Sequence, residues 1–203
     1  MIIDKRQLVA ACQQRDPEAM KQLYVELAPT MLGVCMRYTH SRDEAQDLLH
    51  DGFIKVFENI NKLNNPLALV SWIYQIMVNL SIDYVVQNSN LQYYDAEKME
   101  GFEDKSDEEQ LDLDKQAKTA EEAVRALQSL PDVYRAAFNM RAVEGMEYDE
   151  MAAKFKKSEA TVRRYVARAR EMIIEKLNTK GKKYERQIEE LCHRTRPQGV
   201  GGY

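Results

Sequence analysis

Apolar residues recur every three or four positions along most of this 203-residue chain, which is the spacing of amphipathic α-helices. The first clear helix opens where Asp16 can act as N-cap and Pro17 takes the first helical position. The apolar positions that follow are Met20, Leu23, Tyr24 and Leu27. They predict one helix with a single buried side.

A capping box, Ser41 with Glu44, opens the most regular helix of the chain. Its apolar positions are Ala45, Leu48, Leu49, Gly52, Phe53, Val56, Phe57 and Ile60. The polar stretch 61–66 (NKLNNP) ends this helix. A third helix is predicted beyond it, with an apolar face made of Val70, Ile73, Ile76, Met77, Leu80 and Tyr84.

The pattern changes after residue 88. Residues 88–118 are acidic and lack a sustained apolar period, which predicts a linker. Helical spacing resumes at Ala120, pauses at 130–132 (LPD) and stops at Gly145.

A short helix is predicted over 148–155, followed by a tight turn at Lys156 and Lys157. Ser158 is placed to cap a further helix that reaches about Leu177. No segment has the pattern of a strand. The expected fold is therefore all-α, with two small helical domains joined by an acidic linker.

Charge is distributed unevenly along the chain. The formal net charge of −4 hides ten acidic residues and two lysines between Asp95 and Asp114, a local net charge of −8. Between Lys154 and Lys183, eleven basic residues and three glutamates give +8. The molecule is dipolar, and its basic stretch from Lys154 to Lys183 is suited to bind an acidic partner.

The basic residues gather on one face of the helix that follows Ser158. The core-facing stripe at helical spacing consists of Val162, Tyr165, Val166, Ala169 and Ile173. The opposite arc carries Arg163, Arg164, Arg168 and Arg170, with the small Ala160 and Ala167 between them. A short helix, a tight turn and a second helix with a basic face form a helix-turn-helix, which places arginines in a DNA groove. A solvated charged face is the alternative, but no acidic residue lies between Ala160 and Arg170.

Other classes of function find little support. The chain has no nucleophile elbow, phosphate loop or HExxH motif, so no enzyme activity and no cofactor are expected. Cys12 and Cys35 are expected to pack as apolar side chains, and the pair Cys192-His193 is half of a zinc site at most, so we expect no metal. Without a long apolar run or a signal-peptide core, we expect a cytoplasmic protein that does not insert into membranes.

Three stretches resemble a known family. DEAQDLLHDGFIKVFENI (43–60) and SWIYQIMVNLSIDY (71–84) resemble region 2 of the bacterial sigma-70 family, and LPDVYRAAFNMRAVEGMEYDEMAAKFKKSEATVRRYVARARE (130–171) resembles region 4. Their order and spacing are similar to the extracytoplasmic-function group of RNA polymerase sigma factors, over residues 6 to 178.

The resemblance implies a domain organisation and a set of partners. Region 2 is expected at 1–90, an acidic linker at 91–119, region 4 at 120–179, and an unassigned tail at 180–203. The expected partners are the β′ clamp helices and β flap of core RNA polymerase, promoter DNA and an anti-sigma factor. The linker is expected to run through basic clefts of the polymerase, where its −8 charge mimics nucleic acid.

The resemblance also implies site residues. Core polymerase is expected to bind a helix face made of Asp47, Leu48, His50, Asp51 and Phe53, although Leu48 and Phe53 also suit a core. The −10 element is expected to meet Asn61, Asn64, Asn65, Trp72, Asn79 and Asp83. Trp72 fits the core better than a stacking platform. The −35 element is expected to meet Thr161, Arg163, Arg164, Ala167, Arg168 and Arg170, of which Thr161 and Arg170 face phosphates.

Three departures from the family pattern stand out. Lys156 takes a turn position where the family has Gly, so a positive φ there would be strained, and Lys157 replaces an apolar residue. DYVVQNSN (83–90) lacks the arginines that relatives carry there, and no basic residue lies between Lys62 and Lys98. Weak phosphate contacts predict dependence on a recruiting partner that targets DNA, for which an RNA-guided DNA binder is one conceivable form.

Two alternatives stay open at this point. One is a helix-turn-helix regulator that never binds polymerase, which co-purification with core polymerase would distinguish. The other is a sigma-like protein that sequesters a partner without supporting transcription, which an initiation assay would distinguish.

Overall fold

The computed structural model describes the backbone of residues 5–89 and 120–194, and the side chains of residues 5–89 and 124–177. The acidic linker expected at 91–119 and the last residues of the tail lie outside these ranges. Within them the chain forms helices and turns and no strand, so the expected all-α fold is confirmed.

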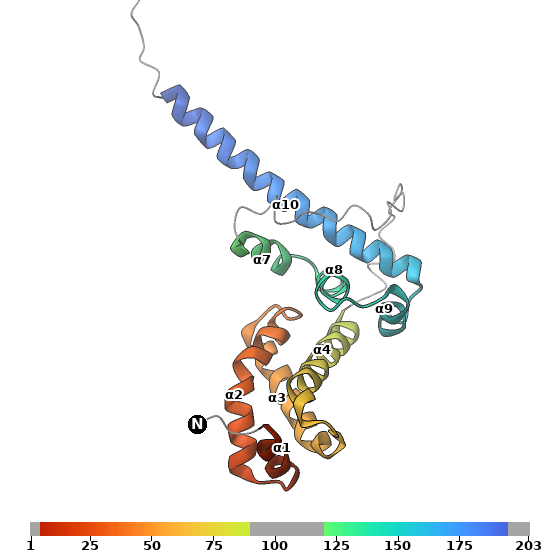
Figure 1. The fold of residues 1–203 in the computed structure, drawn as a ribbon. Helices are drawn as coiled ribbons and strands as arrows, with labels where there is room; N and C mark the ends of the chain where they lie inside the picture. The colour runs from red at the N-terminus through yellow and green to blue at the C-terminus, as the bar shows by residue number, and fades with distance from the viewer. Residues whose placement is uncertain (1–4, 90–119, 195–203) are drawn as a thin grey trace, which may run out of the picture.

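The N-terminal group of helices contains the long elements α2 (Pro17–Met36), α3 (Arg42–Asn59) and α4 (Leu69–Asn88), preceded by the short α1 (Lys5–Gln13). The single turns η1 (Ile60–Lys62) and η2 (Pro66–Ala68) connect α3 to α4. Helices α2, α3 and α4 pack against one another, and α1 lies against α2, η1 and η2 (Figure 1).

Local sequence chemistry sets the start of these helices. The Asp16 carboxylate accepts the backbone N–H groups of Glu18 and Ala19, both at 2.9 Å, and thereby caps α2. Ser41 and Glu44 form the predicted capping box at the start of α3. Both predicted starts are confirmed.

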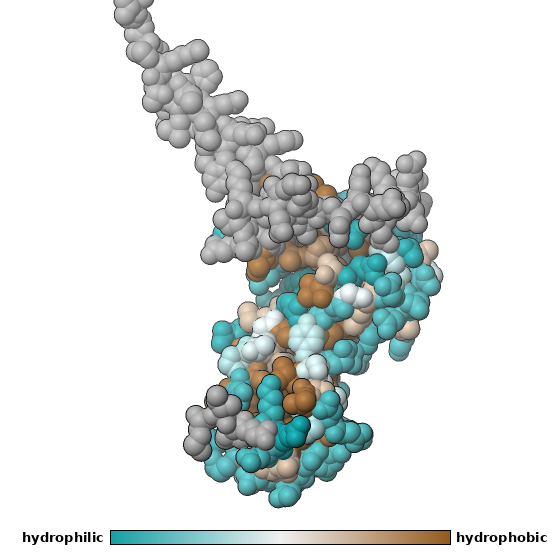
Figure 2. All heavy atoms as spheres, in the orientation of Figure 1, coloured by the Kyte–Doolittle hydropathy of each residue, from teal (hydrophilic) through white to brown (hydrophobic). Residues whose placement is uncertain are grey.

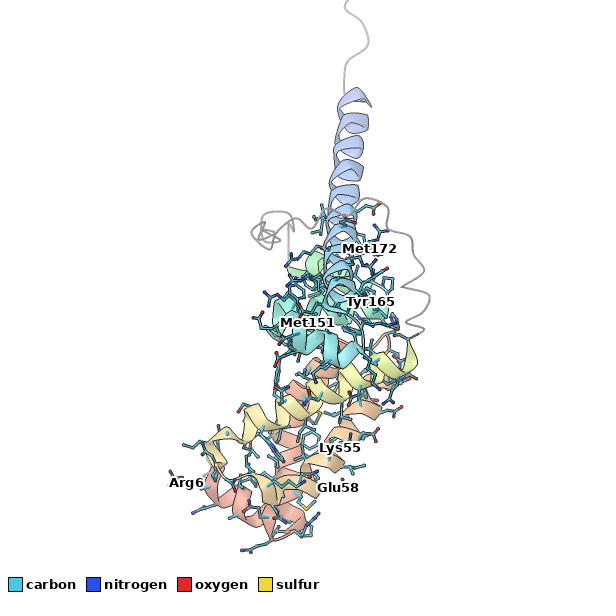
Figure 3. All side chains as sticks on the ribbon, turned by 90° about the vertical axis from the view of Figure 1, so that its right-hand side faces the viewer. Arg6, Lys55, Glu58, Met151, Tyr165 and Met172 are labelled. Carbon is cyan, nitrogen blue, oxygen red and sulfur yellow. The ribbon has the colours of Figure 1, made fainter. Side chains whose placement is uncertain are left out.

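The C-terminal group contains α7 (Ala120–Gln128), α8 (Asp132–Phe138), α9 (Tyr148–Phe155) and α10 (Glu159–Arg194), with a π-helical turn η3 (Asn139–Val143) after α8. Helix α10 packs on α7, α8 and α9 (Figure 1). In Figure 3, Tyr165 on α10 and Met151 on α9 lie within this group. The predicted stripe of α10 is confirmed as core: Val162, Tyr165, Val166, Ala169 and Ile173 are all buried.

Helix α10 is longer than the sequence pattern predicts. The pattern places its end near Leu177, but the backbone stays helical to Arg194 and runs away from the other helices (Figure 1). Apolar periodicity detects the part of a helix that packs, and the second half of α10 lies apart from the other described helices in Figure 1.

Helix α4 is apolar on more than the predicted side. Ile73 and Met77 are buried as expected, but Val78, Ile82 and Val85 are buried too. The reason is that α4 contacts α2 and α3 of its own group of helices and also α8 and α9 of the C-terminal group. With η2, α4 is long and apolar enough to cross a membrane, contrary to the expectation from sequence, but the core helix of a globular protein has the same length and composition.

The two groups of helices meet at the C-terminal end of α2. Two side chains of the C-terminal group bind carbonyls there: Asn139 donates to the oxygen of Arg37 at 2.8 Å, and Arg135 donates to that of Tyr38 at 3.2 Å. Arg135 is only 1% exposed, and burial lowers the pKa of its guanidinium. A cation at the end of α2 complements the helix dipole.

A buried carboxylate completes this contact. Glu144 accepts hydrogen bonds from the hydroxyls of Tyr74 (2.8 Å) and Tyr38 (3.4 Å) and pairs with Arg37 at 3.4 Å. Arg37 also donates to the Tyr74 hydroxyl at 2.8 Å. Burial, followed by the charge of Glu144, raises the pKa of Tyr38, so its hydroxyl stays a donor. The two domains are therefore joined by a polar contact centred on the end of α2.

On the face shown in Figure 2, the described surface is mostly hydrophilic, with hydrophobic patches between. Cys12 and Cys35 are free and buried, as predicted, and burial raises the pKa of both thiols. Among the residues with described side chains, no cluster of metal-binding groups occurs.

Candidate nucleic-acid and polymerase interfaces

A pocket of about 300 Å³ lies where α3 and η1 face α4 (Figure 3, where Lys55 is labelled). Its lining consists of Lys55, Asn59, Lys62, Trp72, Ile76, Asn79, Leu80 and Asp83. The structure thus brings three predicted −10 residues, Trp72, Asn79 and Asp83, into one site. Trp72 is half-buried and lines the pocket, so its indole is not enclosed in the core.

Two lysines line the same pocket as Trp72. Lys55 comes from α3 and Lys62 from η1, and the ammonium of Lys62 donates to the Asn59 side chain at 2.7 Å. An aromatic face beside two cations and amide groups suits a nucleotide: the ring can stack on a base while lysines meet phosphates.

The predicted asparagines Asn61, Asn64 and Asn65 lie beside the pocket, in η1 and the loop between η1 and η2, and do not line it. All three are exposed. Asn65 accepts the backbone N–H of Leu67 at 3.1 Å and so caps η2, which gives it a structural role. Asn61 and Asn64 are therefore the better candidates of this set for contact with DNA.

The sequence-based prediction of the −10 site does not include Lys55, Asn59 and Lys62. They follow one another at steps of four and three residues, which places them on one side of a helix and its last turn. That spacing is visible in the sequence, but only the pairing of α3 with α4 brings these side chains and Trp72 around one pocket.

The residues predicted to form the polymerase face of α3 differ in exposure. Asp47, His50 and Asp51 are exposed, whereas Leu48 and Phe53 are only 7% and 2% exposed. Both belong to the stripe that packs α3 into the bundle, as their apolar spacing indicates, so the exposed part of the predicted polymerase face consists of Asp47, His50 and Asp51.

A different apolar side chain lies on this face. Ile54, which the apolar spacing does not select, is 56% exposed and follows Asp51 by three residues. Tyr24 of α2 borders the face as well, with its ring 6.3 Å from that of His50 and nearly parallel to it. The exposed surface thus combines two carboxylates, an imidazole and one apolar group.

The basic residues of α10 lie on a helix that packs on α7, α8 and α9. Its residues differ in how they are held. Arg164 is exposed and donates to the Thr161 hydroxyl at 3.2 Å. Arg163 lies over the ring of Tyr148, 4.0 Å from its centroid. Ala167 and Arg170 are half-buried.

Two glutamates that flank the stretch from Ala160 to Arg170 pair with arginines of this face. Glu159 lies 3.9 Å from Arg163, and Glu171 lies 3.2 Å from Arg168. Both pairs are on the surface, where such contacts contribute little to stability and exchange easily for another anion. The face keeps its positive character around Arg164.

The domain contact reaches the edge of the pocket. Lys154 of α9 donates to the side chain of Asn79 at 2.8 Å. A predicted −10 residue of one domain is therefore engaged by the other domain in this arrangement.

Comparison with known proteins gives two family matches. The family described as Sigma-70 region 2 matches residues 23–90, and Sigma-70, region 4 matches residues 120–173. The chain is 30% identical over 175 residues to the RNA polymerase sigma-H factor of Pseudomonas aeruginosa, covering 83% of this chain and 91% of that protein. It is 29% identical over 179 residues to the ECF RNA polymerase sigma-E factor of Escherichia coli, covering 84% of this chain and 92% of that protein.

Among solved structures, CnrH in complex with the cytosolic domain of CnrY matches with 18% identity and a TM-score of 0.44, covering 87% of this chain and 99% of that one.

Proposed function

This chain belongs to the extracytoplasmic-function group of the sigma-70 family and is an RNA polymerase sigma factor, and on that premise we propose which of its surfaces bind promoter DNA and which binds core polymerase. Sigma factors are regulatory subunits of a cytoplasmic polymerase and not enzymes. Because regions 2 and 4 both match, a regulator that never binds polymerase and a purely sequestering protein are not favoured.

The pocket between α3 and α4 carries the proposal for the −10 element. In it, Trp72 offers a ring for a base, Asn79 and Asp83 offer groups that can read a base edge, and Lys55 and Lys62 offer cations for the backbone. A flipped base costs a few kcal/mol of unstacking, which a stacking surface of this kind offsets. We assign the strand separated at the −10 element to this pocket and to the adjoining loop with Asn61 and Asn64.

The exposed arc of α10 is assigned to the −35 element. Arg164 leads this arc because it is exposed and can extend into a major groove, with the small Ala167 beside it. Thr161 and Arg170 lie at the edges of the arc, where phosphates would pass.

The acidic face of α3 is assigned to core polymerase. Asp47 and Asp51 are one helical turn apart and both exposed, so they can meet cationic side chains of the clamp helices together. Charge reversal of both, Asp47→Lys with Asp51→Lys, is expected to abolish co-purification with core polymerase while the far-UV spectrum and the unfolding midpoint stay unchanged.

The matched control reverses two exposed glutamates on other helices, Glu26→Lys with Glu175→Lys. It changes the net charge equally, so loss of binding in only the first variant assigns the effect to the α3 face. A folded Asp47 and Asp51 variant that still co-purifies with core polymerase would refute the assignment.

A recruiting partner stays part of the proposal. Helix α4 contains no lysine or arginine, so the cations that line the pocket beside it are those of α3 and η1. Fewer phosphate contacts mean weaker intrinsic promoter binding. Strong, selective initiation from a randomised promoter library with purified protein and core polymerase alone would reject the need for such a partner. An anti-sigma factor is an expectation from the resemblance only.

A further inference from the structure

The side chain of Gln13 joins α1 to the loop beside the pocket. Its amide nitrogen donates to the backbone oxygen of Ile60 at 3.1 Å and to that of Leu63 at 3.3 Å. One NH₂ group thus uses both of its hydrogens on the two ends of a single turn, η1. A side chain of the first helix therefore holds a turn that lies about fifty residues later in the chain.

The contact fixes the turn from its inner side. Ile60 and Leu63 are buried, with 0% and 7% exposure, while Asn61 and Lys62 between them are exposed. The Leu63 N–H donates to the Ile60 oxygen at 3.1 Å, so Gln13 adds to a turn that the backbone already closes. With both ends held, the residues between them are presented outward in one orientation.

Gln13 is itself held by a rigid corner. Two residues after it the chain turns at Arg15, which has a φ of 62°, and the N–H of Asp16 donates to the oxygen of Ala11 at 3.1 Å. This is the geometry of a Schellman motif, and Asp16 at once caps α2. The buried Val9 and Cys12 fix the rest of α1. The amide therefore projects from a backbone that cannot easily shift.

The turn forms part of the pocket wall. Lys62 lines the pocket and bonds to Asn59, and Trp72 of α4 lines the same pocket. If η1 moved, Lys62 would move with it and the distance to Trp72 would change. Gln13 acts on the pocket through this turn and does not line it.

We propose that Gln13 is a positioning residue for −10 recognition, whose amide holds η1 so that Asn61 and Lys62 meet the separated DNA strand in a fixed geometry. The inference rests on the proposed function of the pocket and loop. Gln13 lies before the stretch that matches region 2, residues 23–90.

The test uses holoenzyme made from the full chain and core polymerase, on a promoter with 2-aminopurine at the −10 position whose base is captured. Gln13→Glu keeps the shape but sets an acceptor against two carbonyls, and Gln13→Met removes the donors without adding charge. Both are expected to slow the fluorescence increase roughly tenfold, the effect of about two lost hydrogen bonds. Gln13→Lys brings back a donor and is expected to recover most of the rate.

Gln14→Glu is the matched control, because Gln14 is the next residue, is exposed and undergoes the same chemical change. It is expected to leave opening unchanged. Preference among the four bases at the captured position is expected to fall in Gln13→Glu and Gln13→Met, while binding of −35 duplex stays the same. A merely destabilised protein would lose activity equally on all four bases.

Two results overturn the inference: equal behaviour of the Gln13 variants and Gln14→Glu, or a loss that is uniform over the four bases and that Gln13→Lys does not restore. The double variant Asn61→Ala with Asn64→Ala, measured in the same assay, distinguishes a failure of the inference about Gln13 from a failure of the proposed function of the loop. If those loop variants leave opening and selectivity intact, base capture by the loop is wrong and the role of Gln13 fails with it. If they lower selectivity and the Gln13 variants do not, only the inference about Gln13 fails.

Discussion

Lys156 ends α9 with a φ of 54° and a ψ of 42°, in the left-handed region that favours glycine. The N–H of Lys157 donates to the oxygen of Ala152 at 3.1 Å and that of Lys156 to Ala153 at 3.3 Å, which together form a Schellman motif. The strain predicted from the sequence is therefore present. The motif also explains why Lys157 is unusual, because that position commonly makes an apolar contact with the helix it follows.

We expect Lys156→Gly to raise the free energy of unfolding of the C-terminal domain by about 0.5–1 kcal/mol, because glycine adopts positive φ without a Cβ clash but gains entropy in the unfolded chain. Chemical denaturation of the full chain measures it. Lys157→Gly, one residue further and without a positive φ, serves as control and should not stabilise. Equal stability of Lys156→Gly and the parent protein would show that the turn is relaxed.

The arginines of α10 are expected to act differently in DNA binding. Arg164→Ala or Arg168→Ala should cost about 1–3 kcal/mol for each lost base contact and change the preferred −35 sequence. Arg170→Ala should weaken binding to all sequences alike. It should also reduce the slope of the logarithm of the binding constant against the logarithm of the salt concentration by about one. Binding of a −35 library at two salt concentrations measures both effects. Identical behaviour of all three variants would contradict the division into base and phosphate contacts.

At the scale of helices, Gly52 sets how closely α3 approaches α4. A Cβ at this position would lie 2.6 Å from the Cε of Met77 and closer still to its sulfur. Met77 is fully buried, so its side chain has little room to move. The same two helices carry residues that line the pocket. Their separation therefore links stability to the proposed −10 site.

Gly52→Ala is expected to lower the free energy of unfolding by about 1–3 kcal/mol through overpacking, and to weaken binding of −10 single strand. Gly33→Ala is the matched control: it lies within α2, and a Cβ there would have no neighbouring atom within 4 Å, so gain of helix propensity should stabilise by up to about 1 kcal/mol. Thermal unfolding and oligonucleotide anisotropy measure the two effects. A Gly52→Ala protein as stable as the parent would mean that Met77 adapts without cost.

At the scale of the molecule, the two domains pack through polar groups that include Asn79, a predicted −10 residue. Glu144 of the C-terminal domain accepts a hydrogen bond from the Tyr74 hydroxyl. Arg135 and Asn139 of the same domain donate to backbone oxygens at the end of α2. Lys154 donates to the side-chain oxygen of Asn79. The same oxygen also accepts from Gln75 at 3.4 Å, so both of its lone pairs are in use in this arrangement. A base that is read by the Asn79 oxygen therefore has to displace one of these two donors.

Lys154→Met keeps the apolar stem and removes the donor, so the free protein should bind a −10 non-template oligonucleotide roughly two- to tenfold more tightly, the range for one hydrogen bond. Lys156→Met removes the same charge from an exposed position and should bind no more tightly than the parent protein. Fluorescence anisotropy with the full chain measures both. Unchanged or weaker binding by Lys154→Met would show that the contact does not compete with DNA.

The helix starts at Asp16, Ser41 and Ser158, the tight turn at Lys156 and the buried stripe of α10 could all be predicted from the sequence. Each depends on residues within about one or two helical turns, where spacing alone fixes which groups meet. The family could likewise be predicted from the sequence, because contiguous motifs carry the resemblance.

Only the tertiary structure decided which helices and turns meet. It placed Lys55 and Lys62 around one pocket with Trp72, and joined Gln13 to the loop about fifty residues later. Periodicity marks an apolar stripe but does not say which helix packs on it. Contacts between distant elements depend on that choice, so a pocket built by two helices and a turn has no signature in any one of them.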